Sequence, residues 1–204
     1  MRIWGRANST NVKKVLWCAD ECGLRWEHVN VGGAYGGLDT PEFRSMNPLG
    51  LVPVLEDGGL VVTESNAIVR YLAATYAAGS LYPLDPRARA IADAWMDWTQ
   101  TSLIPLLFTL IMGLVRSPPE GRDMVAITAA RERALLLIGQ LDRTLSRQPF
   151  LSGETLGIGD IPAGSAIHAL LELGIGDHLP SVLRWYEMLR ERSGYQKFVA
   201  LPLT

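Results

Sequence analysis

The chain has 204 residues, of which 48% are apolar and 20% are charged, a composition typical of a globular protein that buries a core. Its 19 basic and 21 acidic residues give a formal net charge of −2, so there is no reason to expect nucleic acid or an anionic membrane as a partner. The first residues carry no long apolar run, and the only two cysteines, Cys18 and Cys22, are spaced for one helix face rather than a redox turn. We therefore expect a cytoplasmic protein in a reducing compartment.

The first 40 residues predict a strand, a helix and a second strand. Residues 2–5 form a short strand candidate, and the polar turn at 8–11 leads into apolar residues at helical spacing, which end at Gly23. Residues 26–31 predict the second strand, and a glycine-rich loop follows at 32–37.

The next segment predicts a helix, a hairpin and another helix. Thr40 followed by Pro41 is a helix-start signal. Residues 52–62 alternate around an Asp-Gly turn, which indicates a β-hairpin, and a further helix begins at Ser65. The order is βαβ and then αββα, in a domain predicted to span residues 1–78.

After a linker rich in proline and glycine at residues 79–86, the strand signals stop. Residues 87–204 predict an all-helical domain. Its most apolar stretch, Leu103 to Val115, is interrupted by Pro105 and Gly113 and is too short to span a bilayer, so we expect a buried amphipathic helix and no membrane. The predicted helices cover about residues 87–116, 124–147, 160–173 and 180–193.

Four segments, at residues 8–15, 47–55, 64–72 and 151–161, together resemble the soluble glutathione transferase superfamily over essentially the whole chain. Among its subgroups the sequence is most similar to the bacterial theta-like and nu-like enzymes, which use a serine or threonine near the N-terminus. The resemblance implies a thioredoxin-like N-terminal domain followed by a helical-bundle domain. It also implies glutathione as co-substrate, a small electrophilic and largely apolar acceptor, and a homodimer.

The resemblance assigns sulfur activation to the turn before the first helix. A thiol with a pKa near 8.5 needs roughly 2.7 kcal/mol of preferential anion stabilisation to lower its pKa by about 2 units. The Ser9 hydroxyl is expected to donate to the glutathione sulfur, with Asn11 as a second polar residue and Thr10 as a fallback donor. On the sequence alone, Ser9 or Asn11 could equally be a plain helix cap.

Four further residues are expected to bind glutathione. The resemblance implies a cis Val52–Pro53 bond, with Val52 presenting its backbone to the cysteinyl part, where the alternative is a trans proline opening an edge strand. Ser65 offers its hydroxyl and N–H at a helix start to the γ-glutamyl carboxylate, or is an N-cap, or both. Glu64 can pair with the ammonium, although a solvated carboxylate is its default.

Two positions depart from the family pattern. Many relatives have lysine, arginine or glutamine just before the Val-Pro pair, where it reaches the glycine carboxylate of glutathione, and this chain has Leu51. Either Tyr35 or a main-chain donor in the 32–40 loop is the expected substitute, or glutathione is expected to bind more weakly than in those relatives. Gly157 stands where the folding motif usually has serine or threonine, so the capping box ahead of Asp160 is half present.

The acceptor pocket is expected between the domains, walled by the first long helix. Ile104, Phe108, Met112 and Arg116 recur every four residues and share a face, although Ile104 and Phe108 could equally be core. The three histidines lack partners at metal-ligand spacing, and no nucleotide-binding loop is present, so no metal or nucleotide is expected.

The function expected is glutathione S-transfer. Two alternatives remain: glutathione-dependent reduction of disulfides or peroxides, and a non-catalytic binding module. Retention of Ser9, Glu64 and Ser65 favours catalysis.

Overall fold

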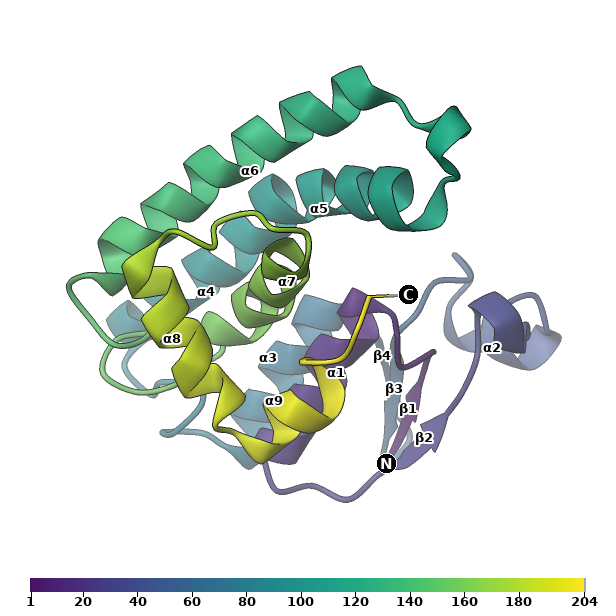
Figure 1. Ribbon diagram of the computed structural model, residues 1–204. Coiled ribbons are helices and arrows are strands. Elements are labelled where there is room, and N and C mark those ends of the chain that lie inside the picture. The colour runs from purple at the N-terminus through teal and green to yellow at the C-terminus, as the bar shows by residue number, and fades with distance from the viewer. Residues whose placement is uncertain (204) are drawn as a thin grey trace.

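The computed structural model of the chain describes residues 1–203 and consists of a small α/β part packed against a larger helical part (Figure 1). The α/β part is built on a four-stranded sheet with the order β2-β1-β3-β4. β1 pairs with β2 in parallel and with β3 antiparallel, and β3 pairs with β4 antiparallel. The strands are β1 (Arg2–Trp4), β2 (Glu27–Val29), β3 (Val54–Asp57) and β4 (Leu60–Thr63).

Helices cover both faces of this sheet (Figure 1). Neighbouring side chains of a strand point to opposite faces. Accordingly Ile3 enters the main core under α1 and α3, while Trp4 packs on the other face, 6.3 Å from Phe43 of α2 between ring centroids. The predicted βαβ-αββα order is confirmed. The helices are α1 (Thr10–Glu21), the single 3₁₀ turn η1 (Gly33–Tyr35), α2 (Pro41–Met46) and α3 (Ser65–Tyr76).

The rest of the described chain is helical, as predicted. The long α6 lies along the outside of the bundle, and α7 lies in its interior, with nearly every residue buried (Figure 1). The elements are α4 (Pro86–Trp98), η2 (Thr99–Leu103), α5 (Ile104–Leu110), η3 (Ile111–Arg116), η4 (Pro119–Gly121), α6 (Met124–Leu145), α7 (Asp160–Glu172), α8 (Pro180–Arg190) and α9 (Ser193–Phe198).

The helix predicted over about residues 87–116 is confirmed, and it passes Pro105 and Gly113 without a break. It runs from Pro86 to Arg116 and widens into π-helical segments at η2 and η3. Pro105 has no N–H to donate, so the pattern of backbone hydrogen bonds along the helix changes just before it. There the N–H of Ile104 donates to the carbonyl of Thr99, five residues back instead of four.

This 31-residue run is long and apolar enough to cross a membrane by length and composition, a test that core helices of soluble proteins also pass. Here α5 lies against α6 and α7, and Leu103, Leu107 and Leu110 are buried between them. The opposite side of the run stays exposed and faces the start of α1 across the molecule (Figure 1).

The two parts share one hydrophobic core, because α1 packs against α7 and α9 as well as α3. Trp17 of α1 meets Tyr195 of α9 with ring centroids 4.8 Å apart, and a Cβ at Gly164 would lie 3.2 Å from the Trp17 ring. Arg192 donates two hydrogen bonds, of 2.7 and 2.6 Å, to Glu21. The sequence did not predict α9, and this packing fixes the orientation of α1 and hence of the residues at its start.

Candidate active site

A cavity of about 280 Å³ lies between the α/β part and the long helix. On the α/β side it is bounded by Leu38, by residues 50–52 ahead of β3, and by the turn that joins β1 to α1. The turn contributes Arg6, Ser9, Thr10 and Asn11. The structure therefore brings both predicted sulfur partners, Ser9 and Asn11, to the same wall.

Ser9 is the residue just before α1, and its backbone does the capping. Its φ of −79° and ψ of 125° are extended, and its carbonyl accepts a 2.9 Å hydrogen bond from the N–H of Lys13. Its half-buried side chain makes no capping bond, and its hydroxyl has no hydrogen-bond partner among residues 1–203. The hydroxyl is therefore available to a ligand in the cavity, close to the positive end of the α1 dipole.

Asn11 holds an unsatisfied acceptor beside Ser9. Its Oδ1 is buried and has no hydrogen-bond partner within the described part of the chain. A buried acceptor without a donor costs roughly 1–3 kcal/mol, and a polar hydrogen of a bound ligand would remove that cost.

The loop that carries Val52 is held by Asn47. The Asn47 amide, 5% exposed, donates to the carbonyl of Leu51 at 2.8 Å and accepts from the N–H of Leu49 at 3.1 Å. The Val52–Pro53 bond is cis, as expected. Val52 borders the cavity, whereas Pro53 is buried behind it.

Glu64 and Ser65 stand at the start of α3, outside the cavity lining. Glu64 is the only residue other than glycine with a positive φ in the described chain, at 67°, a conformation that costs energy and persists where the surroundings enforce it. Its side chain is exposed, and the Ser65 side chain is almost fully buried. The helix α3 packs beside α1 and runs in the same direction, because Lys14 contacts Asn66 and, further along both helices, Cys18 contacts Val69. The starts of α1 and α3 therefore lie at the same end of the α/β part.

The long helix forms the opposite wall. Ile104, Phe108 and Arg116 line the cavity together with Leu107 and Ile111, and their role toward an acceptor stays a prediction. Phe108 is 64% exposed, which excludes the alternative that it is a core residue. Met112 does not line the cavity, because the helix widens into η3 and breaks the spacing of four; its Sδ instead lies 3.9 Å from Nη1 of Arg116.

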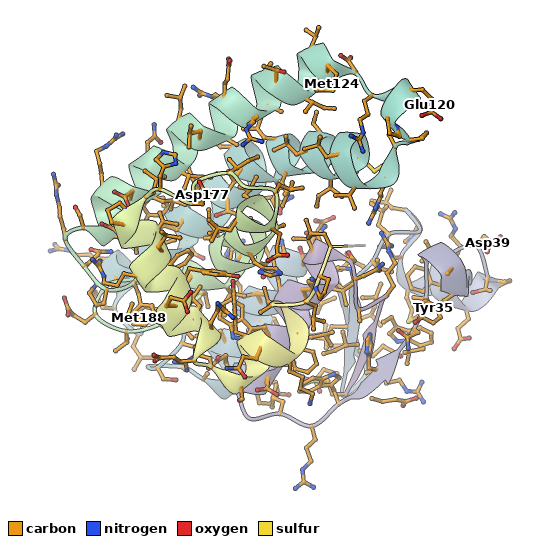
Figure 2. The ribbon with its side chains drawn as sticks, viewed as in Figure 1. Tyr35, Asp39, Glu120, Met124, Asp177 and Met188 are labelled. Carbon is orange, nitrogen blue, oxygen red and sulfur yellow. The ribbon has the colours of Figure 1, made fainter. Side chains whose placement is uncertain are left out.

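A second cavity of about 560 Å³ adjoins the first and shares Arg6 and Arg116 with it. Tyr35, the residue suggested as a substitute for the missing polar group at Leu51, lines this second cavity and not the first. It lies in the loop beside α2, at the same edge as Asp39 (Figure 2). Its role toward glutathione stays a prediction.

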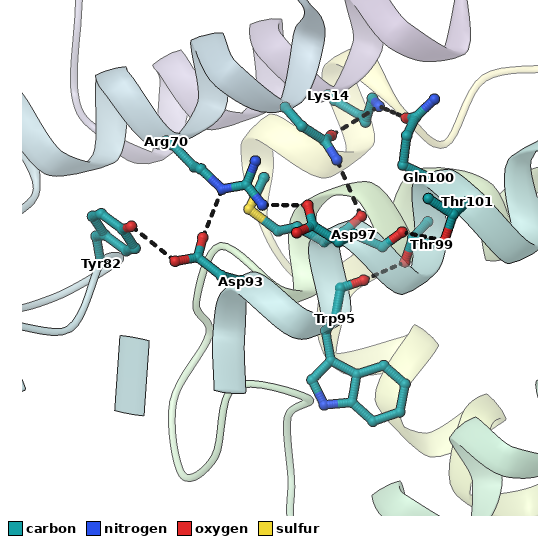
Figure 3. A network of polar contacts seen from close by, with 11 residues as sticks. Lys14, Arg70, Tyr82, Asp93, Trp95, Asp97, Thr99, Gln100 and Thr101 are labelled. Atoms are coloured by element: carbon teal, nitrogen blue, oxygen red, sulfur yellow. Dashed lines mark hydrogen bonds and ion pairs between the residues drawn. The ribbon is translucent and has the colours of Figure 1, made fainter. Parts of the chain in front are cut away.

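A buried lysine connects the start of α3 to the long helix. Lys14 of α1 is fully buried, and its Nζ donates to Asn66 Oδ1 at 3.1 Å and to Gln100 Oε1 at 3.3 Å (Figure 3). Asn66, which follows Ser65, donates in turn to the carbonyl of Met96 at 3.1 Å. Burial lowers the pKa of Lys14 to about 7, with Glu64 acting in the opposite direction.

This lowered pKa predicts a pH-dependent stability. The unfolded chain binds more protons than the folded one between pH about 7 and the ordinary lysine pKa of about 10.4, so stability should rise across this window, by at most about 1.4 kcal/mol per pH unit. Lys14→Met should remove that rise, so its stability relative to wild type should be greatest at low pH. Urea unfolding at pH 6.5, 8 and 9 measures this difference.

The exposed Lys197 offers a control for the loss of a surface amine, as Lys197→Met. Lys14→Met also leaves the side-chain oxygens of Asn66 and Gln100 without their donor, which lowers stability by an amount that does not vary with pH. The test is therefore the slope of the stability difference against pH, and not its size at one pH. A constant difference between Lys14→Met and wild type across the three pH values would contradict the prediction.

A second polar cluster joins α3 to α4 near this lysine (Figure 3). Arg70 donates to Asp93 at 2.6 Å and to Asp97 at 2.5 Å, and Tyr82 donates to the other oxygen of Asp93 at 3.0 Å. The two carboxylates raise the pKa of Arg70 despite its partial burial. The cluster is internally paired and lies outside both cavities.

Comparison with known proteins decides the family. The family model described as glutathione S-transferase, N-terminal domain, matches residues 8–75. Glutathione S-transferase GstB of Escherichia coli (strain K12) is 42% identical to this chain, with 99% of each protein covered. The chain belongs to the glutathione S-transferase family.

Solved glutathione S-transferases have the same fold over the full chain. A theta class member from Xanthomonas axonopodis pv. citri with glutathione bound has a TM-score of 0.95 and 49% identity, covering 100% of this chain and 98% of that one. Its apo form has a TM-score of 0.87. Glutathione S-transferase F14 of Arabidopsis thaliana is 33% identical over 98% of this chain and 80% of its own length.

Sequence reasoning gave no role to three residues that shape this glutathione S-transferase site. Arg6 lines both cavities, Asn47 holds the loop of Val52, and Lys14 supports the start of α3. Asn47 and Lys14 were part of the motifs that carried the family resemblance, but their partners are distant in the sequence. Arg6 carried no signal beyond its place in the turn before Ser9.

Proposed function

We propose that this chain binds glutathione along the edge of the cavity formed by Ser9, Val52 and the start of α3, and that the Ser9 hydroxyl activates the sulfur. As a member of its family the chain is a glutathione transferase; the residue roles are the proposal. The observation that carries it is the Ser9 hydroxyl, which lies in the cavity with no hydrogen-bond partner among residues 1–203.

Ser9 acts as a donor to the nucleophile and not as the nucleophile. Its hydroxyl donates to the ionised sulfur, and the N-terminal end of α1 adds a favourable field. Asn11 is the second polar partner: its Nδ2–H groups can donate to the sulfur, whereas its unpartnered Oδ1 can accept from an N–H of the ligand. The thiolate then forms a C–S bond with an electrophilic carbon of the acceptor, and the leaving group departs with its electron pair.

The remaining parts of glutathione have partners nearby. The backbone of Val52 can pair with the cysteinyl part in the manner of an added strand. The buried Ser65 hydroxyl and N–H, at the start of the 12-residue α3, suit the γ-glutamyl carboxylate, and the exposed Glu64 suits its ammonium. The positive φ of Glu64 supports this assignment, because such conformations cluster at ligand sites.

The acceptor occupies the side of the cavity under the long helix. Ile104, Phe108 and Ile111 give that side an apolar surface, which favours a small electrophile with apolar body. We further propose a homodimer in the cytoplasm, and a division of the chain into residues 1–78, a linker at 79–86 and residues 87–204.

Conjugation assays test the proposed function. Glutathione and 1-chloro-2,4-dinitrobenzene should give the dinitrophenyl conjugate, followed by absorbance, faster than a small disulfide or a hydroperoxide is reduced. Faster reduction than conjugation would assign the chain to the reductase alternative. No reaction, together with no glutathione-dependent rise in melting temperature, would point to a non-catalytic module.

Ser65→Ala should weaken glutathione binding by about tenfold, because it removes a charge-assisted hydrogen bond to the γ-glutamyl carboxylate. Isothermal titration of glutathione into the variant measures the change. Ser146→Ala, which alters an exposed serine at the far end of α6, is the matched control and should bind as wild type does. An unchanged affinity in Ser65→Ala would exclude this contact.

A further inference from the structure

The charged side chains that line the two cavities are all positive. Arg6 and Arg116 line both of them, and neither lining includes an aspartate or a glutamate from the described residues. A cavity lined by one sign of charge concentrates ligands of the opposite sign. An acceptor in this space therefore meets two guanidinium groups and no side-chain carboxylate of residues 1–203.

Arg6 is held in place by the glycine-rich loop. A Cβ at Gly33 would lie 3.0 Å from Arg6 Cδ, and one at Gly32 would lie 3.4 Å from Arg6 Nη1. Both glycines have positive φ, 58° at Gly33 and 84° at Gly32, and the loop can pass this close to the arginine because these positions lack side chains. The guanidinium is thus laid across the junction of the two cavities.

No carboxylate neutralises Arg6 in the described chain: within residues 1–203 it has neither a hydrogen bond nor an ion pair through its side chain. Burial, and then repulsion by Arg116, lower the pKa of Arg6. Arginine nevertheless stays charged at neutral pH. Two cations that repel each other at one site gain from an anion between them.

Arg116 approaches from the opposite wall, at the end of η3. Its Nη1 lies 3.9 Å from Met112 Sδ, and the residue lines both cavities. Guanidinium groups bind carboxylate and sulfonate oxygens through paired N–H donors. Phe108 and Ile104 lie on the same wall and provide apolar contact for the body of a ligand.

We propose that Arg6 and Arg116 form an anion subsite for the acceptor, so that the preferred electrophile carries a carboxylate or sulfonate in addition to its apolar body. This inference rests on the proposed function, since it names the acceptor class of the same cavity. The anion is held by the two arginines, and the electrophilic carbon is presented to the sulfur at Ser9.

A matched pair of acceptors tests the subsite: 4-chloro-3,5-dinitrobenzoate and its neutral amide, 4-chloro-3,5-dinitrobenzamide. In both, the thiolate forms a bond to the ring carbon that carries chlorine, and chloride leaves with the bonding electrons. The selectivity ratio is kcat/KM for the carboxylate divided by kcat/KM for the amide, each corrected for its uncatalysed rate. In the wild type it should be at least about 10.

Arg6→Gln and Arg116→Gln should each lower this ratio about tenfold, and added salt should lower it in the wild type. Two variants are used so that, if circular dichroism shows a folding defect in one of them, the other still tests the subsite. Arg133→Gln removes an exposed arginine on α6 and is the matched control for net charge; its ratio should equal that of wild type.

Three results would overturn the inference while leaving the proposed function intact: a wild-type ratio near 1, a ratio unchanged in both arginine variants, or an equal fall in the control. An unchanged ratio with a raised KM for glutathione would show that the arginines bind the glycine carboxylate of glutathione instead. Failure to conjugate either acceptor would count against the proposed function itself.

Discussion

Replacing Ser9 with alanine should lower kcat about 50-fold at pH 6.5, while the dissociation constant of glutathione rises only about twofold. The hydroxyl stabilises the anion, so its loss returns the pKa of the bound thiol from about 6.5 toward about 8.5. At pH 6.5 the bound thiol is then about 1% ionised instead of about half. Binding changes little at this pH, because only the ionised half of bound glutathione benefits from the hydroxyl.

The pH profile separates this role from a structural one. Measured from pH 5.5 to 9 with a chlorodinitrobenzene acceptor, kcat of Ser9→Ala should approach that of wild type at the alkaline end, where the thiol ionises without help. Ser9→Thr keeps a hydroxyl and should retain most of the activity at pH 6.5.

Thr10→Ala and Asn11→Ala test the neighbouring donors. We expect both to shift the profile less than Ser9→Ala does, since the Ser9 hydroxyl alone combines a place in the cavity with the position just before α1. A profile of Ser9→Ala that superposes on that of wild type, while one of the other two shifts, would move the sulfur contact to that residue.

Local signals were enough to predict most of the elements. Thr40 accepts from the N–H of Phe43 at 3.2 Å, as the Thr-Pro-Glu start predicts, and the Asp-Gly-Gly turn joins β3 to β4. These signals act within a few residues, so they can be read without knowledge of the fold. The βαβ-αββα order followed from them, and the motif resemblance supplied the arrangement in space.

Contacts between distant segments could not be predicted. The helix α9 is only six residues long and depends on Trp17 and Glu21 of α1 for its packing. The long helix widens into a π-helical segment at η3, and Met112 therefore does not line the cavity. A prediction based on 3.6 residues per turn does not include such a change in the helix. The surroundings of Arg6 and Lys14 likewise depend on tertiary contacts, because their neighbours come from loops and helices far along the chain.

Gly157 shows how a departure from the family pattern is accommodated. A side chain at this position would place its Cβ 2.5 Å from that of Ser152. The Ser152 hydroxyl accepts a 3.2 Å hydrogen bond from the N–H of Gly159, the residue before α7. The N–H of Asp160, which a hydroxyl at position 157 would otherwise accept from, donates to the carbonyl of Gly157 at 3.0 Å. The carboxylate half of the capping box is formed, because Asp160 Oδ2 accepts from the N–H of Gly157 at 3.1 Å.

Asp160 is the central acceptor of this region and should be the most costly residue to remove from the helical part. It is fully buried, and its Oδ1 accepts from the N–H of Leu151 at 2.7 Å and from Trp185 Nε1 at 3.0 Å. Its Oδ2 accepts from the N–H of Gly157 at 3.1 Å and of Ser152 at 3.3 Å. Burial raises the pKa of Asp160, although all these donors act in the opposite direction.

Asp160→Ala should therefore destabilise the protein by about 4 kcal/mol or more, because it leaves buried N–H groups without an acceptor at roughly 1–3 kcal/mol each. Asp160→Asn should lower stability by less, about 2 kcal/mol. The amide keeps one acceptor oxygen, but its NH₂ group would face N–H donors that a carboxylate oxygen now accepts from. The urea midpoint at a fixed protein concentration measures the stability of both variants. If the alanine variant does not accumulate, Asp160→Asn alone tests the prediction.

Asp177→Ala, which removes an exposed carboxylate beside His178, is the matched control and should change stability by less than about 0.5 kcal/mol. The effect of Asp160 should fall on stability and not on the residual chemistry of folded molecules, because it lines neither cavity. A folded Asp160→Ala protein with a urea midpoint close to that of wild type would mean that water or a neighbouring group replaces the carboxylate. The donors now assigned to it would then not hold the start of α7 in place.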